Sequence, residues 1–97
     1  MKRDKEITPL SAAIDKLLKA YRISDKMDEI SLEKEWRELM GDAIANKTTK
    51  IELRKKVLFI QLDSSVLRHE LNFAKDKLKE SLNKKMKRRV VDEIIFS

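Results

Sequence analysis

The spacing of apolar residues changes at Gly41, which is the only glycine in the chain. Before Gly41 the apolar residues recur every three or four positions, which is the period of an amphipathic helix. In the segment that follows Gly41 they alternate with polar residues, which is the period of a strand. The chain must therefore combine helices with a sheet, and Gly41 marks a bend or a close contact that no other position needs.

The N-terminal part is predicted to begin with a flexible segment, residues 1–7, followed by a helix over residues 8–23. Thr8 followed by Pro9 is typical of an N-cap with proline at the first helical position. The apolar residues then follow the helical period, and they are Leu10, Ala13, Ile14, Leu17, Leu18 and Tyr21. The apolar face of this helix must pack against another apolar surface.

A polar stretch, residues 24–29, interrupts the apolar pattern. Ser31 can cap a second helical segment, which we expect over residues 31–46. Trp36 lies four residues after Leu32 in this segment, so it is interpreted as a core anchor rather than a partner contact.

Beyond Gly41 the pattern predicts a hairpin over residues 48–62, a helix over residues 64–83 and a strand over residues 90–96. Phe59 lies in the second hairpin strand, whose β-branched and aromatic run is typical of a well-buried strand. Asn83 suits a left-handed C-cap of the helix. Three residues could cap its start, namely Asp63, Ser64 and Ser65.

These elements predict one α+β domain over residues 1–97 with the order ααββαβ. A strand, helix and strand in succession form a right-handed crossover between parallel strands, whereas a hairpin is antiparallel. We therefore expect a small three-stranded mixed sheet packed against helices on one face.

Several classes of function are disfavoured by what the chain lacks. Without cysteine there is no thiolate nucleophile and no cysteine-type zinc site, and a single glycine cannot build a phosphate-binding glycine-rich loop. The chain has no apolar signal segment and no apolar run of membrane-spanning length. We expect a cytoplasmic protein that is not an enzyme and that has no cofactor, no small-molecule substrate and no membrane contact.

The few residues that resemble catalytic or metal-binding groups have simpler interpretations. His69, the only histidine, follows Ser65 by four residues, but no orienting acid or oxyanion hole accompanies the pair, so a solvated surface histidine is favoured. Asp25, Asp28 and Glu29 lack the glycine and terminal glutamate of a calcium loop. We predict no metal site.

The positive charge is concentrated in the second half of the chain. The formal net charge is +6, with 11 basic and 10 acidic side chains in residues 1–50 against 12 and 7 in residues 51–97. Residues 84–89 hold five cations in six positions, which is typical of a phosphate-binding surface, although cations also stabilise a helix C-terminus. The predicted nucleic-acid-binding residues are Arg68, Lys75, Lys79, Lys84, Lys85, Lys87, Arg88 and Arg89.

The first three of these residues fall within about 40° of one another on a single helix over residues 64–83. A third basic cluster, residues 54–56, lies in the hairpin turn, and the sequence does not reveal whether the clusters share one surface. Val66 and Phe73 project away from the apolar seam of the helix. They either lie under another helix or form an exposed partner-binding spot.

From Trp36 onward the chain resembles the DciA family, also called domain of unknown function 721. The similarity is carried by EWRELMGDAIANKTTKIEL, VLFIQLDSSVLRHEL and LNKKMKRRVVDEIIF. The residues that match the family pattern are Trp36, Gly41, Ala45, Thr48, Leu58, Leu71, Leu82, Asn83 and Ile94. The chain departs from the pattern at Leu67, where tryptophan is common, and at Lys55 and Lys56, where a glycine often precedes the strand.

The resemblance implies a KH-like fold and a role in bacterial DNA replication, as a loader or operator of the DnaB-type replicative helicase that binds single-stranded or forked DNA. A KH domain grips the nucleic-acid backbone with a GXXG loop, which this chain cannot form with Gly41 alone. Lysine and arginine would then hold the DNA. Two alternatives remain open, namely an adaptor that docks proteins through Val66, Phe73 or the face near Tyr21, and an RNA-binding module.

Overall fold

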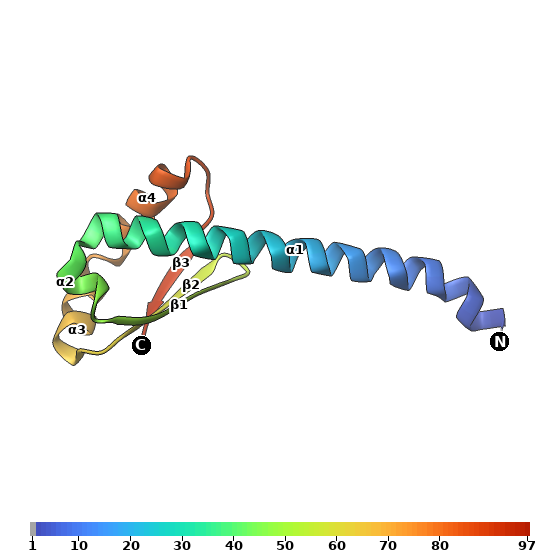
Figure 1. Cartoon of the computed structure of the whole chain (residues 1–97), viewed down its shortest axis with the longest axis horizontal. Helices are drawn as coiled ribbons and strands as arrows, with labels where there is room; N and C mark the ends of the chain where they lie inside the picture. Colours follow the sequence, from blue (N-terminus) through green and yellow to red (C-terminus); the bar gives the residue numbers. More distant parts are fainter. Residues whose placement is uncertain (1) are drawn as a thin grey trace.

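The computed structural model describes the backbone of residues 2–97 and the side chains of residues 9–97, whereas Met1 lies outside the described residues. The chain forms seven elements, shown in Figure 1. They are α1 (Lys2–Met40), α2 (Asp42–Ala45), β1 (Thr48–Arg54), β2 (Val57–Leu62), α3 (Ser65–Phe73), α4 (Lys75–Met86) and β3 (Glu93–Phe96). The predicted α+β class is confirmed.

The sheet has the predicted topology, with the strand order β1-β2-β3. Strands β1 and β2 are antiparallel and pair Leu53 with Leu58, whereas β2 and β3 are parallel and pair Leu58 with Ile94. The mixed three-stranded sheet predicted from the hairpin and the crossover is therefore confirmed. The KH-like label, which came from the resemblance, stays a prediction.

Helix α1 is one continuous helix of 39 residues, so the predicted interruption at residues 24–29 is wrong. Those residues include no glycine or proline, and a polar stretch changes which face is apolar without ending a helix. The helix also begins at Lys2 rather than at Thr8, which places Pro9 inside it. The backbone of residues 2–7, predicted to be flexible, thus belongs to α1.

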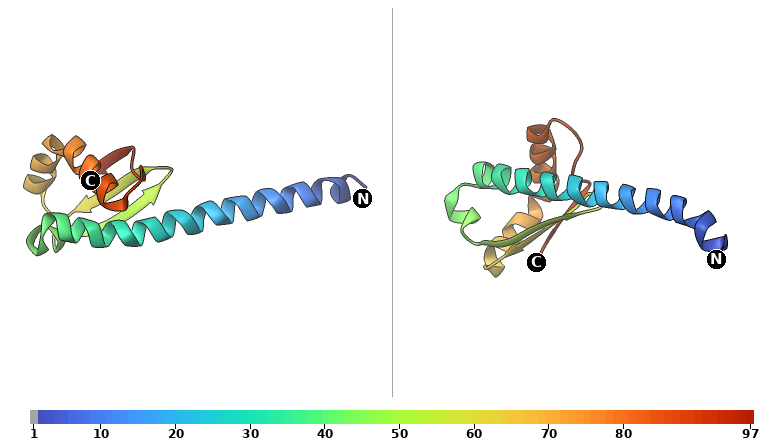
Figure 2. Two further views of the ribbon diagram at one scale, coloured as in Figure 1. Left: turned by 90° about the horizontal axis from the view of Figure 1, so that it is seen from above. Right: turned by 45° about the vertical axis from the view of Figure 1, so that its right-hand side comes forward.

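The long helix gives the molecule an elongated shape, with extents of 59 × 27 × 20 Å. Figure 2 shows the C-terminal half of α1 beside the sheet and α4, while the N-terminal half extends away from every other element. We call residues 9–23 the projecting segment and residues 32–40 the core segment of α1.

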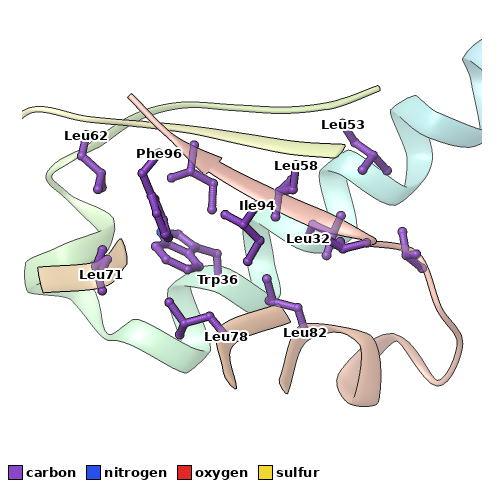
Figure 3. Close-up of a cluster of buried hydrophobic side chains, with 13 residues drawn as sticks. Leu32, Trp36, Leu53, Leu58, Leu62, Leu71, Leu78, Leu82, Ile94 and Phe96 are labelled. Atoms are coloured by element: carbon purple, nitrogen blue, oxygen red, sulfur yellow. The ribbon is translucent and has the colours of Figure 1, made fainter. Parts of the chain in front are cut away.

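The core lies between the inner face of the sheet and the helices, as Figure 3 shows. Trp36 is almost fully buried, and its ring centroid lies 6.1 Å from that of Phe96 on β3. Around it pack Leu32, Leu78, Leu82 and other aliphatic residues. The prediction that Trp36 is a core anchor is confirmed.

Within the described residues no helix covers the other face of the sheet, and this corrects the prediction for Phe59. Phe59 alternates with the buried Leu58 and Ile60, so it points to the open face and is only half-buried. The guanidinium of Arg54 lies 4.7 Å from the centre of its ring. A sheet covered on one face alone buries every second residue, so the apolar run of β2 is half core and half surface.

The helix predicted over residues 64–83 is divided into α3 and α4 at Ala74, whose φ of −101° and ψ of 7° leave the helical region. Among the three possible N-caps the structure uses Ser64, whose hydroxyl oxygen accepts a hydrogen bond from the Leu67 N–H at 3.2 Å. The final strand is also shorter than predicted, because only Glu93–Phe96 of residues 90–96 pair with β2.

A hydrogen-bonded corner joins α1 to the sheet. Gly41 has a φ of 83°, a conformation that side chains disfavour, and no atom lies within 4 Å of where a Cβ would stand. The glycine is therefore needed for the turn rather than for space, so of the two predicted alternatives the bend is confirmed and the close contact is wrong. Beyond the turn, the Trp36 indole N–H donates to the Thr48 hydroxyl at 2.9 Å, and that hydroxyl donates to the Ile44 carbonyl at 3.1 Å.

Candidate nucleic-acid interface

The basic run at residues 84–89 lies where α4 ends and the chain turns back toward β3. Helix α4 ends at Met86, and Lys87 is its left-handed C-cap, with a φ of 60°. The prediction that Asn83 is the C-cap is therefore wrong. Asn83 lies inside α4, and its side-chain oxygen accepts hydrogen bonds from the Val90 N–H at 2.9 Å and the Val91 N–H at 2.8 Å.

Asn83 thereby fixes the path of the loop, residues 87–89, that carries three of the cations. Its amide N–H also donates to the Val91 carbonyl at 2.8 Å, so one side chain binds both the N–H and the carbonyl of Val91 in the chain that returns to β3. Val90 and Val91 are buried, whereas residues 87–89 between them and α4 are exposed. The loop must therefore present Lys87, Arg88 and Arg89 to solvent.

A shallow hollow of about 620 Å³ opens beside this loop, and we call it the α4 hollow. Its lining consists of Lys79, Glu80, Asn83, Lys84, Lys87, Arg88 and Arg89. Five of the eight predicted nucleic-acid-binding residues thus gather around one surface. Lys75 and Lys85 do not line it, although both lie on α4.

Three of the cations in the basic run pair with carboxylates, which reduces the field that they project. Arg88 pairs with Asp28 of α1, Lys85 Nζ lies 3.6 Å from Glu35 Oε2 of α1, and Arg89 Nε lies 2.7 Å from Asp92 Oδ1. The first two pairs tie α4 and its loop to α1. Two of the cations predicted to bind nucleic acid, Lys85 and Arg88, therefore help to hold α4 and its loop against α1.

Three lysines of the α4 hollow have no ion pair among the described residues: Lys79, Lys84 and Lys87. Lys84 and Lys87 are exposed, and Lys79 is half-buried. Without carboxylate partners, these ammonium groups are the ones most available to phosphates.

The turn between β1 and β2 brings a second basic group to this end of the molecule. The Lys56 carbonyl accepts hydrogen bonds from the Asp92 N–H at 2.7 Å and the Glu93 N–H at 3.4 Å, so the turn lies against the chain that follows the basic run. Lys55 and Lys56 are exposed. The backbone of the turn therefore contacts the chain just beyond the basic run, whereas Arg54 is turned to the open sheet face.

Arg68 is not part of this surface. It was predicted to align with Lys75 and Lys79 along one helix, but the division at Ala74 means that a single helical period does not connect α3 to α4. The Arg68 Nη1 donates to the Leu62 carbonyl at 3.3 Å, at the end of β2. The prediction that Arg68, Lys75 and Lys79 form a stripe along one helix is therefore wrong.

The predicted partner-binding residues form an exposed apolar spot on α3. Val66 is 70% exposed and Phe73 is 79% exposed, so the alternative that another helix covers them is wrong. The His69 ring stands edge-on to that of Phe73, with the centroids 5.1 Å apart. The histidine is exposed, as its surface interpretation predicted.

Neither a metal centre nor a membrane span is found in the part of the chain that the structure describes. No group of three or more histidine or acidic side chains there could hold a metal ion. No helix within the described residues combines the length and the apolar character that a membrane crossing requires.

The fold and its basic end define the class, a small α+β domain with a mixed three-stranded sheet and a cationic hollow. A family model described as Dna[CI] antecedent, DciA, matches residues 9–96. The chain therefore belongs to the DciA family, which acts in bacterial DNA replication, in the loading of the replicative helicase. The DciA family is not a known family of enzymes. No curated protein and no solved structure matches the chain significantly.

The residues that carried the resemblance have structural roles in the fold. Trp36, Gly41 and Thr48 build the corner between α1 and β1, Ala45 is buried beside them, and Asn83 holds the returning chain. The matching residues therefore define the fold. They do not include the cations of the α4 hollow, whose arrangement comes from the structure.

The sequence interpretation missed two determinants of the interface. The pairing of Lys85 with Glu35 and of Arg88 with Asp28 depends on contacts between distant segments, and no sequence signal located it. The role of Asn83 had a signal, since the asparagine precedes a basic loop and two valines, but the C-cap interpretation used it differently.

Proposed function

We propose that this protein is a non-enzymatic, cytoplasmic accessory of the DnaB-type replicative helicase that binds single-stranded or forked DNA through the α4 hollow and the β1–β2 turn. The observation that carries the proposal is the set of unpaired lysines at Lys79, Lys84 and Lys87 around one hollow. The exposed lysines of the turn, Lys55 and Lys56, are proposed as its second part.

The binding is electrostatic. No aromatic side chain lines the α4 hollow, so bases have no stacking platform there, and phosphates are the groups that its lysines recognise. With three to five phosphates neutralised, the logarithm of the affinity for a single strand falls against the logarithm of salt concentration with a slope of about −2 to −3.5. Affinity then varies little with base sequence.

The test is a titration of a labelled oligothymidylate at several salt concentrations by fluorescence anisotropy. Replacing Lys79, Lys84 and Lys87 together with glutamine removes three phosphate contacts, so the magnitude of the slope should fall by about 2. The matched control replaces Lys16, Lys19 and Lys34 of α1, which are exposed, lie outside the hollow and carry the same charge. Equal losses in the two variants would refute the assignment to the hollow.

DNA and RNA of equal length can be compared in the same assay. A surface that contacts phosphates alone discriminates weakly between them, whereas an RNA-binding module makes contacts to the 2′-hydroxyl. Preference for RNA by more than about tenfold at matched salt would favour the RNA-binding alternative, since one good contact contributes about this much.

A second candidate function is docking of a protein, and the exposure of Val66 and Phe73 on α3 favours it. Phe73→Asp should weaken binding to purified replicative helicase if this spot is the docking site. Asn72→Asp adds the same charge at an exposed neighbour and serves as the control. Loss of helicase binding with unchanged DNA binding would assign the spot to the helicase.

A further inference from the structure

The projecting segment of α1 carries an apolar stripe that no other part of the described chain covers. The side chains of the stripe are between 48% and 64% exposed. They are Leu10, Ile14, Leu17, Leu18 and Tyr21. An isolated helix of this length is marginal in water, and helices of proteins owe most of their stability to the packing of an amphipathic face. A partner that covered the stripe would therefore stabilise the projecting segment.

The stripe continues the face by which α1 enters the core. At 100° per residue its middle lies within about 40° of the middle of the face formed by Leu32, Trp36 and Leu39. These core residues are packed in the hydrophobic cluster. One face of a single helix is thus covered at one end and open at the other.

The charges of the projecting segment lie away from the stripe. Asp15, Lys16, Lys19 and Arg22 lie about 90° or more from its middle. The stripe therefore offers nothing to attract an acidic or a basic partner, and it presents no like charges that would repel an identical surface.

The spacing of the stripe is symmetric. Leu10, Ile14, Leu17 and Tyr21 are separated by four, three and four positions, so the series reads the same in both directions. In an antiparallel pair of identical helices, Leu10 stands opposite Tyr21 of the second copy, and Ile14 stands opposite its Leu17. A two-fold interface of this kind uses the same patch on both subunits, which a symmetric stripe satisfies.

We propose that the projecting segments of two copies of this chain pair antiparallel through this stripe to form a homodimer. Complete burial of the exposed parts of the five side chains on both copies would remove at most about 1,100 Å² from water, which is near the lower limit for a specific interface. The dimer is therefore weak and dissociates on dilution. The dimer carries one basic end on each side of the helix pair. The proposal does not depend on what these basic ends bind.

The first test is sedimentation velocity over a wide range of protein concentration. The mass should rise from the 11.4 kDa of one chain toward twice that value as the concentration increases. Leu17→Lys places a charge in the stripe and should weaken the dimer by at least about tenfold. Ala12→Lys adds the same charge on the opposite face, where the residue is exposed, and should leave association unchanged.

The second test fixes the orientation, and the absence of cysteine from the chain makes it unambiguous. Chains with Leu10→Cys mixed with chains with Tyr21→Cys should form disulfide-linked pairs quickly, whereas Leu10→Cys chains alone should link slowly. Circular dichroism confirms that each variant remains folded. A single-chain mass at every concentration, a dimer that survives Leu17→Lys, or faster linking of Leu10→Cys with itself would overturn the proposal.

Discussion

The projecting segment and the core segment of α1 share one helix, one apolar period and nearly one apolar face, but their surroundings differ completely. In the core segment Leu32 is 0% exposed, whereas Leu17 in the projecting segment is 58% exposed. Periodicity thus reports which face of a helix is apolar and not what covers it. The residues between the two segments show where the cover begins.

The boundary lies in the polar residues 24–29, and it is built from specific contacts. The buried Glu29 carboxylate accepts a hydrogen bond from the Leu53 N–H of β1 at 3.3 Å, and Asp28 pairs with Arg88. The interruption of the apolar pattern therefore marks the point at which α1 meets the sheet and the basic loop. It is a change of environment along one helix.

The largest effect is expected when the same substitution is made in each segment. Leu32→Ala removes a fully buried side chain and should lower the free energy of unfolding by about 2–5 kcal/mol, whereas Leu17→Ala should change it by at most about 0.5 kcal/mol in dilute protein. Urea denaturation measures both. Similar losses for the two variants would abolish the distinction between the segments.

The next effect concerns the segment that returns from α4 to β3. Asn83→Ala leaves the buried N–H groups of Val90 and Val91 without their partner and should cost about 2–3 kcal/mol. Asn72→Ala, at an exposed position on α3, should cost less than about 0.5 kcal/mol. Thermal or urea unfolding distinguishes the two, and equal effects would deny Asn83 its positioning role.

A smaller effect is expected at the boundary between the segments. Glu29→Ala removes the acceptor for the Leu53 N–H and should destabilise the protein by about 1–2 kcal/mol. Glu29→Gln keeps an acceptor oxygen and should lose less, and Glu33→Ala, at an exposed position of the same helix, is the control. A loss for Glu33→Ala as large as for Glu29→Ala would contradict this account of the boundary.

The smallest effect lies in the β1–β2 turn, where Lys56 has a φ of 65°. Lys56→Gly relieves a conformation unfavourable to side chains and should raise stability by about 0.5–1 kcal/mol, while Lys47→Gly, outside the positive-φ region, should lower it. If the turn contacts DNA, Lys56→Gly should also reduce the salt slope by about 0.7. Unfolding and salt titrations measure the two quantities on one variant.

Much of the fold could be predicted from local rules. Trp36 sits at a helical spacing among leucines, Gly41 is the only glycine and so the residue best suited to a positive φ, and the hairpin followed by a helix and a strand permits few topologies. Each of these features depends on neighbours in the sequence, so the sequence was enough to locate them.

The features that the sequence did not predict depend on distant neighbours. Phe59 has the residue type of a core strand, but its burial depends on whether a helix covers that face of the sheet. Arg88 and Lys85 belong to a basic run, but their charges are offset by Asp28 and Glu35 of α1, more than forty residues away. The candidate site could therefore be located by its charge, while its effective charge could not.

Hydrogen exchange along α1, measured at low and high protein concentration, tests the difference between the two segments most directly. Amides of residues 32–40 should exchange only through global unfolding at any concentration, because their face is in the core. Amides of residues 10–23 should exchange rapidly in dilute protein and become protected as copies pair. Uniform slow exchange along the whole helix in dilute protein, or fast exchange of residues 9–23 that persists at high concentration, would contradict the account.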